Sequence, residues 1–180
     1  SFSAGCDILN CFSFTGGFSV YALNSGANKV VNLDSSSEAL SILAKNFSLN
    51  GVDSLKYENV QDDVFIYLRK MRDTNRQFDI IILDPPKFAE SVSQIEKASR
   101  GYKDINLLAL KLLKKGGILF TFSCSGHITL ELFNKIIADA STDAHREVRI
   151  LKHLTQAPDH TMLTSFPEGL YLKGLVCKVN

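Results

Sequence analysis

The sequence predicts an α/β fold: a Rossmann-like, doubly wound, mostly parallel sheet of seven strands with an antiparallel C-terminal hairpin. Strand-like and helix-like apolar segments alternate five times along the chain, which is typical of parallel strands joined by helices. Two more strand-like segments, 148–154 and 171–179, follow without a helix between them, so we expect them to pair antiparallel. No repeat or linker divides the 180 residues, so we expect one domain over residues 1–180.

The first predicted strand carries Ile8 and Leu9 and stops at a glycine turn over residues 13–17. Paired glycines let the backbone pass close to a ligand, and the helix expected over 18–24 would point free N–H groups at it. Adjacent glycines also form ordinary turns, so this pattern alone leaves a ligand site and a plain turn both open.

The second predicted strand, residues 29–33, ends on Asp34. Ser35 and Glu38 match a capping box for the next helix, which Asn50-Gly51 is expected to end. That helix should bury one apolar face, made of Ala39, Leu40, Leu43, Ala44 and Phe47.

The third and fourth strands are expected near 55–60 and at 78–83, on either side of a helix that Asp62 or Asp63 caps. Residues 78–83 form the most apolar run of the chain, which indicates burial on both faces of the sheet. Two prolines end this strand in the sequence Asp84-Pro85-Pro86.

The polar segment after these prolines, residues 87–102, is expected to form a loop or a short helix. Asp104 is expected to cap the helix that follows, which runs to about Leu113. The fifth strand is expected at 118–122 and the fifth helix at 129–140.

The composition excludes several classes of protein. The net charge is +1, so no overall positive field indicates nucleic-acid binding, although a local basic patch is compatible with it. The sequence shows no apolar run that would cross a membrane, no secretory signal pattern and no His/Cys cluster with metal-ligand spacing. The four cysteines do not form a disulfide framework, so we expect a reduced, cytoplasmic protein. Whether it forms a homodimer is left open.

Polar residues follow all five predicted parallel strands. The strand ends lead to the glycine turn, Asp34, Asp62-Asp63, Asp84 and Ser123-Cys124-Ser125. Each alone is most simply a cap or a turn, because Asp and Ser favour those positions. Open α/β sheets bind ligands at the carboxyl ends of their strands, so five such features at one edge indicate a functional site.

The spacing of Gly16 and Asp34 indicates the kind of cofactor. Asp34 lies 18 positions after Gly16, close to the offset of about 20 at which an acidic residue meets a ribose. The chain lacks the full G-x-G-x-x-G pattern of a pyrophosphate site, which favours a nucleoside cofactor without phosphates. S-adenosylmethionine fits, with Asp34 accepting from the ribose and Asp63, or Asp62, accepting from the adenine amino group.

Taken together, these motifs resemble class I S-adenosylmethionine-dependent methyltransferases, and more closely the bacterial family that makes 5-methylcytosine in large-subunit ribosomal RNA. The matching segments are 10–18, Asp34, 62–65, 84–88, 100–106, 121–125 and 167–174. In that family an RNA-binding PUA domain and a small middle domain precede this catalytic domain, so the chain is expected to be a fragment that lacks both. The resemblance implies cofactor contacts from Asn10, Phe12, Phe14, Thr15, Gly16, Gly17, Asp34, Ser35, Asp62, Asp63, Val64 and Asp84.

Cys124 is the expected catalytic nucleophile. C5 of cytosine is a poor nucleophile, so its methylation needs a temporary bond at C6, and a cysteine thiolate is a suitable attacking group. A lone cysteine is more often a buried structural residue, but a position among serines at a strand end favours catalysis here. The resemblance implies that Asp84, the second catalytic residue, hydrogen-bonds the cytosine ring; capping the turn is its simpler role.

RNA contacts are expected mainly from the segment after the fourth strand. The expected substrate-binding residues are Pro85, Lys87, Phe88, Arg100 and Lys103, with Lys97 as a further phosphate contact. A solvated loop is the alternative interpretation of these charges. Many RNA 5-methylcytosine enzymes carry a second cysteine near the position of Lys87, implicated in product release. Its absence leaves Cys124 as the nucleophile and leaves open which group removes the C5 proton.

The sequence thus predicts methyl transfer from S-adenosylmethionine to C5 of a cytosine in 23S ribosomal RNA through a covalent Cys124 adduct. The nearest alternative is methylation of a guanine nitrogen, which related enzymes with Asp-Pro-Pro motifs perform without a cysteine. A catalytically silent RNA-binding module is another. A nicotinamide-dependent oxidoreductase is the least favoured, because the phosphate-binding glycine pattern is missing.

Overall fold

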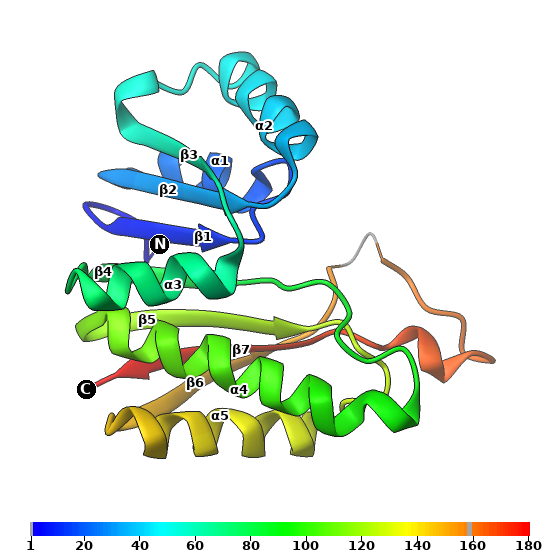
Figure 1. Ribbon diagram of the computed structural model, residues 1–180. Coiled ribbons are helices and arrows are strands. Elements are labelled where there is room, and N and C mark those ends of the chain that lie inside the picture. Colours follow the sequence, from blue (N-terminus) through cyan, green and yellow to red (C-terminus); the bar gives the residue numbers. More distant parts are fainter. Residues whose placement is uncertain (1, 158–159) are drawn as a thin grey trace.

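A single sheet runs through the whole molecule in the strand order β3-β2-β1-β4-β5-β7-β6 (Figure 1). The computed structural model describes residues 2–157 and 160–180. Its strands are β1 (Asp7–Cys11), β2 (Lys29–Asp34), β3 (Tyr57–Gln61), β4 (Phe78–Leu83), β5 (Leu113–Ser123), β6 (Val148–Leu154) and β7 (Lys173–Val179). Strands β1 to β5 pair in parallel, and β7 lies antiparallel between β5 and β6. The predicted doubly wound fold and its antiparallel end are confirmed.

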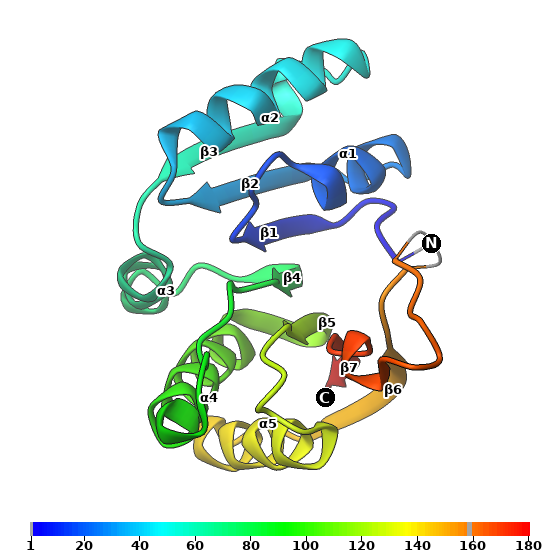
Figure 2. The ribbon, with the colours of Figure 1, turned by 90° about the vertical axis from the view of Figure 1, so that its right-hand side faces the viewer.

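Five α-helices cover the two faces of this sheet (Figure 2). They are α1 (Gly17–Asn24), α2 (Ser37–Leu49), α3 (Val64–Asp73), α4 (Ile95–Leu112) and α5 (Leu130–Ala144). Helices α1 and α2 share a hydrophobic core with one face, and α3, α4 and α5 share a larger core with the other. The order of strands changes direction between β1 and β4, which is where sheets of this kind bind ligands.

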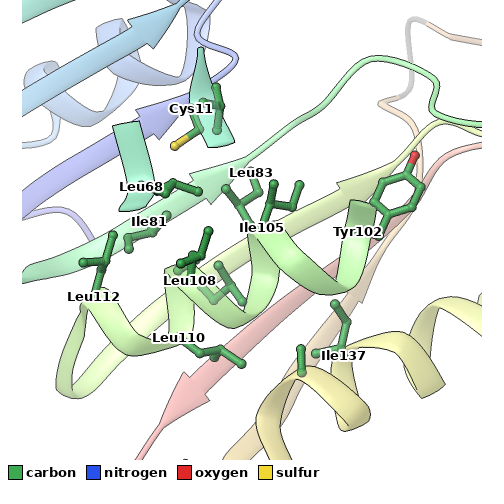
Figure 3. Packing of buried hydrophobic residues seen from close by; sticks show 14 of the residues in the cluster. Cys11, Leu68, Ile81, Leu83, Tyr102, Ile105, Leu108, Leu110, Leu112 and Ile137 are labelled. Atoms are coloured by element: carbon green, nitrogen blue, oxygen red, sulfur yellow. The ribbon is translucent and has the colours of Figure 1, made fainter. Parts of the chain in front are cut away.

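Helix α4 contributes most to the larger core, which Figure 3 shows between this helix and the sheet. Tyr102, Ile105, Leu108 and Leu112 recur at helical spacing and are almost wholly buried. Burying a side chain of this size contributes roughly 1.5–3 kcal/mol, so this row fixes α4 firmly against the sheet. The helix thereby carries its polar face, and the loop before it, to a defined position at the carboxyl edge.

The start of α4 corrects the sequence prediction. The helix begins at Ile95, nine residues before the expected cap Asp104. The segment 87–102, expected as a loop or a short helix, is therefore a loop with a 3-10 turn up to residue 94 and part of a long helix from residue 95 onward. Ser91 and Gln94 form a capping box for the short 3-10 turn, 92–94, that leads into it. Asp104 instead lies inside the helix and pairs with Arg69 at 2.6 Å. The polar residues of this stretch occupy the outer face of a helix whose inner face is buried.

Other boundaries differ by smaller amounts. Ser36, rather than Ser35, caps α2 by accepting a hydrogen bond from the Ala39 amide, and Ala44 lies on the exposed side of that helix. Strand β5 begins at Leu113, earlier than expected, because its first residue already pairs with Phe78. Helix α5 extends to Ala144, and β7 begins at Lys173 rather than at 171.

Two structural properties bear on the class of protein. Within residues 2–157 and 160–180, every helix is too short or too polar to span a bilayer. The same residues contain no group of three or more His, Cys, Asp or Glu side chains that would hold a metal ion.

Candidate active site

The turn after β1 is shaped by backbone geometry. Phe12 and Phe14 have positive φ angles of 57° and 47°, and Gly16 has φ 84°. A Cβ atom on Gly16 would lie 2.6 Å from Cγ of Leu43 on α2, so only glycine fits both the angle and the space. The Ser13 amide donates to the Leu33 carbonyl at 3.0 Å, which joins the turn to β2. This geometry brings the turn to the carboxyl edge and starts α1 at Gly17.

Asp34, at the end of β2, stabilises the same turn through hydrogen bonds. Its carboxylate accepts hydrogen bonds from the Phe14 amide at 2.8 Å and the Ser36 amide at 2.9 Å. A carboxylate has about four lone-pair positions, so acceptor capacity remains after these two bonds. Asp34 therefore organises the turn and keeps an acceptor for a hydroxyl group of a ligand.

Asp62 and Asp63, which follow β3, have different hydrogen-bond partners. Asp62 accepts hydrogen bonds from Lys70 Nζ at 2.7 Å and from the Asp63 amide, and the Lys70 bond lowers the pKa of Asp62 below its usual value. Asp63 caps α3 through one oxygen, which accepts from the Ile66 amide at 3.0 Å, and the residue is exposed. The sequence left open whether Asp62 or Asp63 is the adenine acceptor. Both oxygens of Asp62 accept hydrogen bonds, whereas only one oxygen of Asp63 does, so Asp63 has more acceptor capacity left. Val64, the first residue of α3, is buried.

A chain of hydrogen-bonded polar side chains, most of them buried, connects β1, α1, β2 and β3 next to the turn. Asn10 donates to Ser19 Oγ at 2.8 Å, Ser19 donates to Asn32 at 2.5 Å, and Asn32 donates to Asn59 at 2.9 Å. Two buried acceptors beside this chain, Asn10 Oδ1 and Ser13 Oγ, have no hydrogen-bond partner among the described residues. Buried polar atoms are nearly always paired, so these two mark a place where a donor is expected.

The donor and acceptor set on this side suits a nucleoside with a charged tail. Amide N–H groups at the start of α1 favour a carboxylate, Asp34 suits a ribose, and Asp63 suits an exocyclic amine. Gly17 has no protein atom within 4 Å of its Cβ position, so the backbone is open to a ligand there. Phe14 is 68% exposed beside it.

Across the sheet, Cys124 and Asp84 lie together at the ends of β5 and β4. The Cys124 thiol donates to the Pro85 carbonyl over 3.7 Å, which places it against the Asp84-Pro85-Pro86 loop. Burial raises the pKa of the half-buried Cys124 thiol, and the nearby Asp84 raises it further, whereas Lys87 and Lys173 lower it. Burial also raises the pKa of Asp84, whose carboxylate forms no hydrogen bond or ion pair within the described part of the chain.

Ser125 holds this half of the site together, and sequence reasoning missed it. Its hydroxyl is wholly buried and accepts from the amides of Phe88 at 3.1 Å and Ala89 at 3.2 Å. It also bonds the Tyr102 hydroxyl at 3.1 Å. One side chain therefore connects the Cys124 loop, the loop after β4 and helix α4. The only signal in the sequence was the second serine of Ser123-Cys124-Ser125.

Phe88 lies between the cofactor half of the site, which is the turn after β1 with Asp34 and Asp63, and the chemistry half, which is Asp84 and Cys124. Its ring centroid lies 4.6 Å from that of Tyr102, 6.1 Å from that of Phe65 and 6.5 Å from that of Phe12. A cavity of about 380 Å³ opens beside it. The cavity is lined by Phe65, Lys87, Phe88, Gln94, Lys97, Ala98 and Gly101. Pro85 is buried, whereas Lys87 is exposed at this cavity.

Two of the expected RNA-binding residues already have partners. Arg100 pairs with Glu96 along the outer face of α4 at 2.8 Å, and Lys103 pairs with Asp143 of α5 at 2.8 Å. The Asp143 contact raises the pKa of Lys103. Lys87 and Lys97 instead lie together at the cavity beside Phe88, and neither belongs to an ion pair within the described residues.

Comparisons with known proteins agree with this geometry. The profile of a family described as S-adenosylmethionine-dependent methyltransferase matches residues 1–163. The chain is 55% identical over 172 residues to Ribosomal RNA large subunit methyltransferase I of Cronobacter sakazakii and 56% identical over 172 residues to that of Escherichia coli. Each match covers 96% of this chain and 43% of the relative, so the chain spans less than half the length of these relatives.

Solved structures show the same architecture. The chain superposes with a TM-score of 0.86 on the crystal structure of SMU.776, a methyltransferase complexed with SAH, at 27% identity. The match covers 98% of this chain and 46% of that one. A Streptococcus mutans protein described as SAM-dependent gives the same TM-score at 28% identity, over 98% of this chain and 45% of that one.

Proposed function

The chain belongs to the S-adenosylmethionine-dependent methyltransferase family, and from this we propose that it methylates C5 of a cytosine in 23S ribosomal RNA through a covalent Cys124 adduct. The observation that carries the proposal is the presence of a half-buried thiol and a half-buried carboxyl group at the ends of the neighbouring strands β5 and β4. Methyl transfer to a nitrogen needs no such thiol, whereas transfer to C5 of a pyrimidine does.

The cofactor half supplies the methyl donor. When bound, S-adenosylmethionine provides an electrophilic methyl group on sulfur. In our proposal the first turn of α1 holds the carboxylate of its methionine part, Asp34 accepts from its ribose hydroxyls and Asp63 accepts from its adenine amino group. The unpaired Asn10 Oδ1 and Ser13 Oγ beside the turn support a bound group that carries donors.

The chemistry half acts on the base. The Cys124 thiolate attacks C6, the electron pair of the C5–C6 double bond becomes available at C5, and Asp84 in its protonated form donates to N3 of the ring. Burial raises the pKa of Asp84, which favours the protonated form needed for that donation. After C5 has gained its methyl group, a base takes the C5 proton, the C6–sulfur bond breaks and N3 returns its proton to Asp84. The double bond, the thiolate and the protonated Asp84 are thereby restored.

The substrate is expected to reach this site as an unpaired base. Cys124 lies at the edge of a folded sheet, which a cytosine stacked inside a duplex cannot approach. Lys87 and Lys97, at the cavity beside Phe88, offer phosphate contacts for the strand that carries it. Relatives named as ribosomal RNA large subunit methyltransferases support the choice of RNA, and in our proposal the protein acts in the cytoplasm.

Product analysis tests the proposal. The intact protein is incubated with S-adenosylmethionine and 23S ribosomal RNA that lacks the modification, and the RNA is then hydrolysed to nucleosides for mass spectrometry. The expected product is 5-methylcytidine with wild-type protein and none with Cys124→Ala. A methylated guanosine, or 5-methylcytidine made equally well by both proteins, would contradict the proposal.

A further inference from the structure

Lys173 reaches the Cys124 loop from the neighbouring strand. It is the first residue of β7 and lies opposite Ser123 in the antiparallel pairing with β5. Its Nζ donates to the Ser125 carbonyl at 2.7 Å and to the Tyr171 carbonyl at 2.6 Å. The half-buried ammonium group is thus attached to the residue that follows Cys124.

Among the residues that the structure describes, the charge of Lys173 has no anionic partner of its own. Every ion pair within residues 2–157 and 160–180 joins other residues, so the bonds of Lys173 go to neutral carbonyl oxygens. An ammonium group has three N–H donors, and two are used. Burying a cation is costly without a compensating charge, which suggests that an anion forms nearby when the protein works.

We propose that Lys173 is a positioning residue that holds the Cys124 loop through the Ser125 carbonyl and whose positive charge favours the Cys124 thiolate. This deepens the proposed function and rests on it for the role of the thiolate. The thiolate is the only form of Cys124 that attacks carbon, so a charge that increases its population increases the rate of adduct formation.

Other charged and titratable groups around Cys124 also affect the pKa of its thiol. Asp84, after β4, acts against the thiolate, and Lys87 on the same loop favours it. Tyr102 on α4 bonds Ser125, and its own pKa is raised by burial and by the charge of Cys124. Burial lowers the pKa of Lys173, whereas the charge of Cys124 raises it, so each of the two charges favours the other.

Thiol alkylation measures this effect without any methyl transfer. The intact protein is treated with iodoacetamide between pH 6 and pH 10, and peptide mass spectrometry follows Cys124 and, as an internal reference, the partly exposed Cys6. The variants are Lys173→Met, Lys173→Gln and Lys173→Arg. Lys173→Gln keeps a donor for the Ser125 carbonyl but carries no charge, and Lys178→Met is the control because Lys178 is exposed on the same strand.

The two neutral variants are expected to alkylate Cys124 about tenfold more slowly at pH 7.5, with the pH profile moved up by about one unit. Lys173→Arg and Lys178→Met should follow wild type, and Cys6 should react alike in all proteins. A wild-type profile for Lys173→Gln would overturn the charge role, and this variant decides the question if Lys173→Met does not fold. A shifted profile in a protein that makes no 5-methylcytidine would leave the Lys173 effect in place and refute the proposed function.

Discussion

The two halves of the carboxyl edge are built by different means. In the cofactor half, positive φ angles at Phe12, Phe14 and Gly16 shape a turn, and Asp34 bonds backbone amides. In the chemistry half, the side chain of Ser125 and the ammonium group of Lys173 connect segments that lie 23 to 48 residues apart in the chain. In the cofactor half the backbone of one turn carries most of the geometry, whereas in the chemistry half side chains from separate segments carry it.

The electrostatic environments differ in the same way. In the cofactor half, the hydrogen bond from Lys70 lowers the pKa of Asp62, and Asp63 is exposed at a helix start. In the chemistry half, burial raises the pKa of both Asp84 and Cys124. A solvated acceptor recognises a ligand, whereas a buried acid is adjusted for proton transfer, so the difference matches the roles proposed for the two halves.

Removing the nucleophile should abolish the function of the chemistry half and leave that of the cofactor half intact. We expect Cys124→Ala to lower the rate of 5-methylcytidine formation by more than about 10⁴-fold, because no other group replaces the bond to C6. Affinity for S-adenosylmethionine, measured by calorimetry, should stay within about twofold of wild type, because Cys124 is not among the groups expected to hold the cofactor.

The buried cysteines provide the control for this substitution. Cys177→Ala removes a thiol that is wholly buried in the core, where burial raises its pKa to about 12, so it is inert at neutral pH. It should lower stability through lost packing and leave the rate per folded molecule unchanged. Loss of cofactor binding in Cys124→Ala would show that the two halves are not independent.

Neutralising Asp84 should affect activity and stability in opposite directions. We expect Asp84→Asn to slow methyl transfer by about 10²–10⁴-fold, because the amide cannot donate an acidic proton to the base. Burial raises the folded-state pKa of Asp84, so its favourable contribution exists below its unfolded pKa and is lost as the pH rises through the folded pKa. Asp84→Asn should therefore unfold at a higher temperature than wild type at pH 7, and the difference should shrink on acidification toward pH 4.

Thermal melts between pH 4 and pH 7 measure the difference in unfolding temperature between Asp84→Asn and wild type. Asp53→Asn is the matched control, because Asp53 is an exposed cap before β3 that accepts from the Leu55 amide. An Asp84→Asn protein that is less stable than wild type at pH 7 would contradict the assignment of Asp84 as a buried, uncompensated acid.

The contrast also explains what the sequence could predict. The glycine turn, Asp34 and the pair Asp62-Asp63 directly follow strands, so their positions at the carboxyl edge were predicted from the strand pattern, and Asp34 also from its spacing to Gly16. Helix α4 was predicted to start nine residues too late, because Lys97 and Arg100 make its first turns look polar while Ala98 and Tyr102 are buried against the sheet. Without that helix in place, the bond from Tyr102 to Ser125 could not be foreseen.

Lys173 illustrates the same limit. It was part of a motif that resembled a family, but its position beside Cys124 depends on β7 inserting antiparallel between β5 and β6. A strand order is a property of the whole sheet, and it cannot be read from the spacing of residues near the end of the chain.

Deleting the Ser125 hydroxyl should disturb the chemistry half more than any other single hydrogen-bonding change. We expect Ser125→Ala to destabilise the protein by about 2 kcal/mol, because the amides of Phe88 and Ala89 lose a buried acceptor. Ser99→Ala is the control, because Ser99 only donates back to the Ile95 carbonyl of its own helix and should change stability by less than about 0.5 kcal/mol. Urea denaturation compares the two, and equal effects would show that Ser125 does not organise the loop.

Removing the charge of Asp34 should lower cofactor affinity and leave the chemistry half unchanged. We expect Asp34→Asn to raise the Kd for S-adenosylmethionine about tenfold, because a charge-assisted hydrogen bond to the ribose becomes a neutral one. The reactivity of Cys124 toward iodoacetamide should not change, since Asp34 and Cys124 follow strands β2 and β5, which β1 and β4 separate in the sheet. Calorimetry and alkylation on the same preparation measure both quantities. If the alkylation rate fell together with cofactor affinity, the glycine turn would extend its influence across the sheet through Phe12 and Phe88, and the two halves would have to be treated as one coupled site.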